Sequence, residues 1–229
     1  MGDTFRAVLA IHILCGGVAL LVAPGAMVTG KGGLWHRRWG KIYFWAMAGV
    51  ALTAVALSLI RPGLFLLLVA VFSFYLAFTG YRVLYRKTPR QAANAADWAG
   101  AALMLVGGLG LVGYGANLLR ASSFGVVAVV FGGIGLLLAA ADVRVFLRPP
   151  ADKRAWWFTH MTRMMAAYIA TVTAFSAVNF EFLPPVLRWL WPTALGTAGT
   201  LLWVRHYRKK FEAATVKSGA GARPEGPAA

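Results

Sequence analysis

The sequence has little of what soluble enzymes and metalloproteins usually contain. It has one cysteine, Cys15, so it can form no intrachain disulfide and no metal site built from several thiolates. Only 13% of its 229 residues are charged, against about a quarter in an average soluble domain. The zinc-protease pattern HExxH and the phosphate-loop pattern GxxxxGK[ST] do not occur. The composition therefore excludes an ordinary cytosolic enzyme, and we assign no catalytic residue.

Long apolar segments, separated by short stretches with Gly, Pro, Ser or charge, occupy most of the chain. Each is about as long as the ~20 residues that a helix needs to cross a bilayer. They cover residues 5–25, 40–60, 64–84, 97–118, 124–145, 158–180 and 187–206. This pattern predicts an all-α, polytopic bundle of seven transmembrane helices over residues 1–207. The Lys-, Gly- and Pro-rich residues 208–229 are expected to form a mobile tail.

The positive charge is distributed unevenly. The chain has 23 Lys and Arg but 7 Asp and Glu, and 19 of the cations fall in every second connection or in the tail. Cytoplasmic loops hold an excess of Lys and Arg, so we expect the N-terminus outside, the C-terminus and tail in the cytoplasm, and the chain in the cell's inner membrane. Placed between apolar segments, the net charge of +16 indicates a lipid bilayer as the partner and no nucleic acid.

Small residues at helical spacing predict which faces point inward, because membrane helices recognise one another through small and polar residues. One such face in segment 97–118 comprises Gly107, Gly110, Gly113 and Asn117. The face in segment 124–145 comprises Ala128, Gly132, Gly135, Ala139 and Asp142. The face in segment 158–180 begins with His160 and Arg163. We expect Asp142, His160 and Arg163 to form a shared polar centre, or alternatively an ion pair that only fixes the packing.

The remaining histidines are candidates for a ligand or a proton relay. His36, Gly40 and Tyr43 share a helical face, and the adjacent Arg37 could hold a phosphate or a propionate. His12 lies about 10 Å inside the membrane at ~1.5 Å per residue, where it could ligate a metal, relay a proton or only bond a carbonyl. His206 lies at the end of the last segment.

Two groups of residues carry a resemblance to known membrane proteins. They are Ile11-His12, Lys31-Gly32 and His36-Arg37-x-x-Gly40-x-x-Tyr43, and then His160-x-x-Arg163-Met164 with Thr173-Ala174-Phe175 and Asn179. These resemble the two signatures of an uncharacterised family of prokaryotic multi-pass membrane proteins, which implies a fold but no activity.

A second resemblance concerns the His-x-x-x-Gly turn that opens a membrane segment, which is similar to cytochrome b561-type haem proteins. Those proteins hold two haems with two histidine pairs. Here the inner side could supply His36 with His160, or either of these with His206, whereas His12 has no outer histidine partner. The resemblance therefore implies at most one bis-histidine haem.

Three functions follow as expectations. The first is electron transfer through a single haem b, or a quinone, with His36 and His160 as axial ligands, Arg37 and Arg163 neutralising propionates, and Tyr43 lining the site. The second is proton-coupled transport of a small solute, in which Asp142 and His160 exchange protons and His12 and His206 extend the relay. The third is an accessory or assembly subunit whose polar cluster only fixes packing.

Overall fold

The computed structural model describes residues 2–88 and 90–220, with side chains as far as Ala213. These residues form seven α-helices and one short 3₁₀ helix, and no strand occurs among them. In chain order the elements are α1 (Asp3–Val28), α2 (Leu34–Ile60), α3 (Leu64–Arg82), η1 (Val83–Tyr85), α4 (Ala95–Leu118), α5 (Gly125–Leu147), α6 (Ala155–Asn179) and α7 (Pro185–Ala220). The predicted all-α class is confirmed.

Six of the helices, α1 to α6, are long and apolar enough to cross a membrane when α3 is taken through η1. The chain is therefore a membrane-type helical bundle. The apolar residues of α7 are interspersed with Trp, Thr, Gly and Pro, and its second half is rich in Lys and Arg. Its mean apolarity falls below that of the other six for this reason, so the seventh span stays a prediction.

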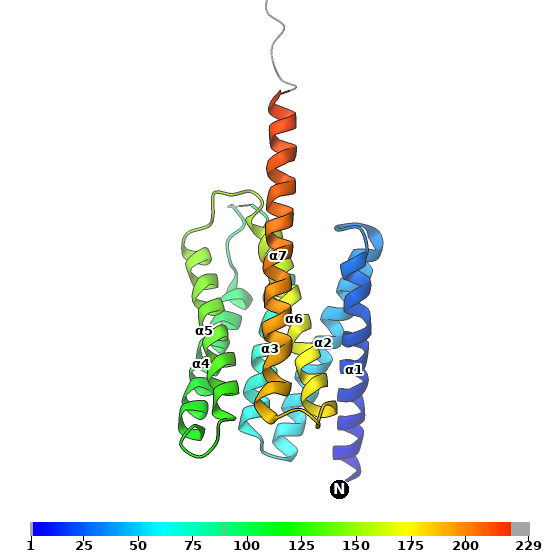
Figure 1. Cartoon of the computed structure of the whole chain (residues 1–229), viewed down its shortest axis with the longest axis vertical. Coiled ribbons are helices and arrows are strands. Elements are labelled where there is room, and N and C mark those ends of the chain that lie inside the picture. Colours follow the sequence, from blue (N-terminus) through cyan, green and yellow to red (C-terminus); the bar gives the residue numbers. More distant parts are fainter. Residues whose placement is uncertain (1, 89, 221–229) are drawn as a thin grey trace, which may run out of the picture.

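Successive helices run in opposite directions, with α3 in the middle (Figure 1). Helix α3 packs against α2, α4 and α6, while α1 pairs with α2, α4 with α5, and α6 with α7. The connections 29–33 and 148–154, the segment that follows η1 and the projecting part of α7 all lie at one end of the bundle (Figure 1). We call this the cation-rich end.

Helix α7 crosses the boundary at residue 207 where we expected a mobile tail to begin. It continues without a break to Ala220 and rises beyond the other helices (Figure 1). Its aromatic side chains explain the continuation, because Tyr207 and Phe211 pack against Trp157 of α6, with ring centroids 4.8 and 5.1 Å apart. Residues 221–229 of the expected tail lie outside the described residues.

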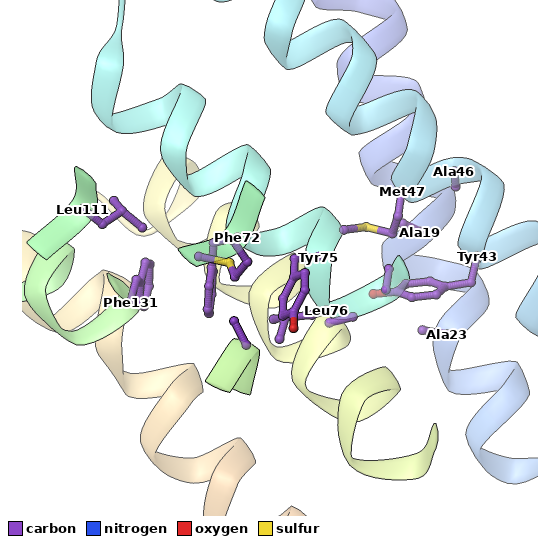
Figure 2. Close-up of a cluster of buried hydrophobic side chains, with 14 of the residues drawn as sticks. Ala19, Ala23, Tyr43, Ala46, Met47, Phe72, Tyr75, Leu76, Leu111 and Phe131 are labelled. Atoms are coloured by element: carbon purple, nitrogen blue, oxygen red, sulfur yellow. The ribbon is translucent and has the colours of Figure 1, made fainter. Parts of the chain in front are cut away.

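The buried core follows α3 and its neighbours (Figure 2). On the α4–α5 side it is aromatic, with the rings of Phe72 and Phe131 stacked at 5.4 Å. On the α1–α2 side it is built largely from small residues, including the fully buried Ala19 and Ala23. Large aliphatic side chains such as Leu52 and Leu59 instead point outward, 73% and 80% exposed. This distribution is expected where lipid solvates leucine as well as the protein interior does.

Glycines set the distance between α4 and α5. A Cβ on Gly132 would lie 2.7 Å from the carbonyl oxygen of Gly108 and 2.9 Å from Cβ of Leu111. Neither atom belongs to a flexible side-chain end, so the two backbones can approach this closely only when residue 132 has no side chain.

Replacing Gly132 by alanine should therefore push α4 and α5 apart and destabilise the bundle by roughly 1–3 kcal/mol, the usual cost of overpacking. The midpoint of thermal unfolding in detergent measures the effect. Gly133→Ala is the matched control, because a Cβ there meets nothing within 4 Å. Equal midpoints for the two variants would contradict the packing described above.

Candidate cofactor-binding site

A cavity of about 450 Å³ opens near the cation-rich end, between α1, α2, α6, η1 and α7. Its wall contains both His36 and His160, three tryptophans and four methionines. The four cationic side chains on the wall are Lys31, Arg37, Lys41 and Lys87. No carboxylate lines the cavity within the described part of the chain. Its volume lies within the ~300–1,000 Å³ that is typical of small-molecule and cofactor sites.

Both cavity histidines are held by backbone carbonyls. Nδ1 of His36 lies 2.9 Å from the carbonyl oxygen of Ala26, and Nδ1 of His160 lies 2.7 Å from that of Gly80. A carbonyl oxygen only accepts, so Nδ1 of each ring donates, and a neutral ring then carries its lone pair on Nε2. The two ring centroids are 6.2 Å apart and the ring planes are inclined at 80°.

Two local features bring these rings together. The short 29–33 connection, with Gly32 at a φ of +78°, folds the first turn of α2 onto the last turns of α1, which places His36 beside Ala26. Gly80 lets α6 approach α3, because a Cβ there would lie 2.9 Å from Sδ of Met164. The carbonyl oxygen of the buried Gly80 can then accept the hydrogen bond from His160.

Two of the four cavity cations, Lys31 and Lys87, contact carbonyls or aromatic rings. Lys31 donates from Nζ to the carbonyl oxygens of Met27 and Ala26 and lies 5.3 Å from the ring centroid of Trp203. Burial lowers the pKa of the Lys31 amine below its ordinary value. Lys87 lies 4.8 Å from the ring centroid of Trp156. Because the ion pairs of the described chain involve only Asp97 and Asp142, the cavity keeps its positive charge.

Tyr43 contributes its ring to the cavity wall and is itself buried. Its hydroxyl lies 3.1 Å from Oγ1 of Thr171. The Thr171 hydroxyl donates to the carbonyl of Ala167 at 3.0 Å, so Tyr43 donates to Thr171. Tyr43 thus ties α2 to α6 at the base of the site.

Asp142 and Arg163 form a separate cluster with Tyr75. Nη2 of Arg163 donates to Oδ1 of Asp142 and to the carbonyl oxygen of Leu138, both at 2.9 Å. Tyr75 donates its hydroxyl to the other carboxylate oxygen. Neither member of the ion pair lines the cavity. The expected centre shared by Asp142, Arg163 and His160 is therefore divided in two: Arg163 faces Asp142, and His160, one turn earlier, faces the cavity.

The other two histidines lie apart from both clusters. Nδ1 of His12 lies 2.9 Å from Oγ1 of Thr53, whose hydroxyl donates to the carbonyl of Gly49, so His12 links α1 to α2. His206 is exposed on α7 and packs edge-on against Tyr207 at 5.4 Å. The sequence analysis assigned no site role to Lys87 or Gly80, and it used Lys31 only as a charge and as part of a family signature. The glycines flanking Lys31 were the one signal of a tight turn there.

Comparison with known proteins does not assign the chain to a family: no protein-family model, curated protein or solved structure matches it. The described residues also contain no group of three or more His, Cys, Asp or Glu that could hold a metal ion. The cavity thus offers two imidazoles and a cationic, aromatic wall. These groups suit a metal complex in which the protein supplies two of the metal's ligands and the complex itself supplies the others.

The geometry of the Asp142–Arg163 pair predicts a large cost of breaking it. Asp142→Asn leaves the Arg163 charge buried without a counterion, which typically costs about 3–5 kcal/mol, and the thermal midpoint in detergent should fall accordingly. The double variant Asp142→Leu/Arg163→Met removes both charges and should regain most of the loss. Glu181→Gln, on an exposed carboxylate, is the control. A midpoint for Asp142→Asn that matches this control would contradict a buried pair.

Proposed function

We propose that the cavity binds one haem b between His36 and His160, and that the protein transfers single electrons in the cytoplasmic membrane. The separation of the two rings carries this proposal. Two imidazoles on opposite sides of one iron have centroids roughly 6 Å apart, since a metal–nitrogen bond takes about 2 Å and half a ring about 1 Å on each side. The observed separation is 6.2 Å.

The hydrogen bonds of the two rings also suit this role. Histidines that ligate a metal donate their other nitrogen to a carbonyl or carboxylate, which fixes the ring and makes the ligating nitrogen more basic. The Ala26 and Gly80 carbonyls act in this way on His36 and His160. Each ring is thereby held ready to ligate through Nε2.

The charge of the wall supports a ligand with carboxylates. Haem b carries two propionates, and the cavity presents Lys31, Arg37, Lys41 and Lys87 without a carboxylate among its described lining residues. We assign the propionates to Lys31 and Lys87, with Arg37 near the mouth. Arg163, which we expected to share this role, is already paired with Asp142.

The rest of the wall suits a flat apolar macrocycle. Trp156, Trp157 and Trp203 provide large aromatic surfaces, and Met161 and Met164 provide flexible side chains that fill irregular gaps. Haem b supplies reversible one-electron chemistry at its iron. His36 and His160 would hold the cofactor, the aromatic wall would shield it from water, and the cations would neutralise its propionates.

The same proposal includes the placement in the membrane. We infer that α7 is the seventh span, that the N-terminus is outside, and that the cation-rich end faces the cytoplasm, because Lys and Arg accumulate on the cytoplasmic side. The haem would then lie near the inner face, within reach of cytoplasmic electron donors. A quinone in the same cavity would contact the cations and tryptophans but would give the paired imidazoles no metal to ligate.

Proton-coupled transport receives less support from the geometry. It needs Asp142 and His160 to exchange protons, whereas Asp142 is bonded to both Arg163 and Tyr75 and lies outside the cavity. A purely structural role for the polar groups suits the Asp142 cluster. It does not account for a cavity with four cations and two imidazoles.

Histidine variants test the proposal directly. Protein expressed with a haem supply should show a Soret band with an iron content of one per chain. Both His36→Ala and His160→Ala should lose at least nine-tenths of the bound haem, because a bis-histidine site needs both ligands. His206→Ala is the control, since that ring is exposed on α7. Wild-type protein without a Soret band would refute the haem assignment.

The cations should raise the reduction potential, because reduction adds negative charge and nearby positive charge favours the reduced form. Lys31→Gln/Lys87→Gln should lower the midpoint potential by on the order of tens of millivolts and weaken haem retention. Redox titration followed at the Soret band measures the shift. Lys153→Gln, on an exposed lysine at the same end, should leave the potential unchanged. A rise or no change in the double variant would contradict the propionate assignment.

A further inference from the structure

The second half of α7 begins beside the first turns of α6 at the cation-rich end. We call residues 205–213 the α7 extension. Trp203, Tyr207 and Phe211 follow one another at four-residue spacing, so they share one helical face. This face packs on α6, where Trp157 contacts both Tyr207 and Phe211. Nη1 of Arg154 adds a hydrogen bond of 3.4 Å to the carbonyl oxygen of Phe211.

The remaining faces of the α7 extension are strongly basic. Arg205, Arg208, Lys209 and Lys210 are exposed there, against one carboxylate, Glu212. None of the four cations belongs to an ion pair of the described chain. Arg205 and Lys209 lie four positions apart, where like charges repel each other and destabilise a helix. Arg208 lies 5.4 Å from the ring centroid of Phe158 and Lys210 lies 5.9 Å from that of Tyr207. The described chain therefore presents a positive surface that no carboxylate neutralises.

A protein suits this surface better than a membrane does. A helix that binds lipid headgroups lies flat in the interface and buries its apolar face in the acyl chains. The α7 extension instead continues the axis of α7 along the first turns of α6 and does not turn to lie flat across the end of the bundle (Figure 1). Its aromatic face is already covered by α6. Charge complementarity then points to an acidic protein.

The surface also begins at the wall of the cavity. Trp203 and Trp157 both line the cavity, and Trp157 touches the aromatic side chains of the α7 extension. A protein docked on the α7 extension would thus be separated from the ligand of the cavity by aromatic side chains such as Trp157.

We propose that the α7 extension is the docking surface for a soluble, acidic one-electron donor. This inference rests on the proposed function, because it names the partner of the haem. The partner would give up one electron, which the cofactor held by His36 and His160 would accept, and no bond would be made or broken. Complementary charge raises the rate of encounter more than it tightens the final complex.

The test compares two double charge reversals of equal size in full-length protein, reconstituted in nanodiscs of zwitterionic lipid. Arg205→Glu/Lys209→Glu changes the surface, and Arg6→Glu/Arg120→Glu changes exposed cations at the opposite end of the bundle. The probe is a reduced, acidic [2Fe–2S] ferredoxin with a fluorescent label. Association is followed by fluorescence and haem reduction by absorbance in stopped flow, and circular dichroism checks that both variants fold.

At low salt we expect the first variant to associate at least roughly tenfold more slowly than wild type, with a weaker salt dependence, and the second to stay within about twofold. Equal rates for both variants would overturn the docking surface. So would a first variant that loses binding to anionic vesicles but not to the ferredoxin, because the cations would then serve lipid. If wild type lacks a Soret band while the association result holds, the haem assignment fails and the docking surface remains.

Discussion

The close approach of α3 and α6 at Gly80 is the constraint on which the candidate site depends. In a membrane, apolar side chains gain little by leaving lipid, so helices are positioned by small residues and polar bonds. Because Gly80 has no side chain, Met164 and Cβ of Arg163 can lie against its backbone, and its carbonyl is free to accept from His160. The register of α3 against α6 thereby fixes the direction of the His160 ring and, one turn later, the path of Arg163 toward Asp142.

This arrangement produces two polar sites, one with its charges neutralised and one with a net positive charge. The Tyr75–Asp142–Arg163 cluster is closed, since its carboxylate and guanidinium neutralise each other in the interior. The cavity is open and positive, and two of its cations, Lys31 and Lys87, contact carbonyls or tryptophan rings. A buried ion pair adds little net stability but defines which helix faces meet. We therefore interpret the first cluster as a device that sets helix packing and the second as the place where a ligand binds.

The sequence predicted the helices and one inward face well. Every residue from Ala128 to Asp142 on the predicted face of α5 is buried, because glycine and alanine alternate there with large residues. On α4 the predicted face was only partly right. Gly107 is buried and Gly110 is partly buried, but Gly113 and Asn117 are exposed. The buried residues Gly108, Leu111 and Gly115 were not predicted. Glycines occur on several sides of this helix, so spacing cannot select a face, and the contact with α5 decides. Lys31 and Lys87 were not predicted as cavity residues because they lie in or beside connections, whose course depends on the packed helices around them.

The cavity is assembled from both ends of the chain. Its wall includes Ala23 and Met27 of α1 as well as Trp203 of α7, and within the described residues α1 and α7 do not pack on each other. Lys31, in the connection that follows α1, contacts Trp203 of α7 and so links the two helices across the mouth of the cavity. During synthesis, α1 and α2 leave the ribosome long before α7, so a nascent chain has no finished pocket. A ligand that needs the whole wall could be captured only after α7 has been synthesised and has packed on α6, so its loading would be a post-translational step.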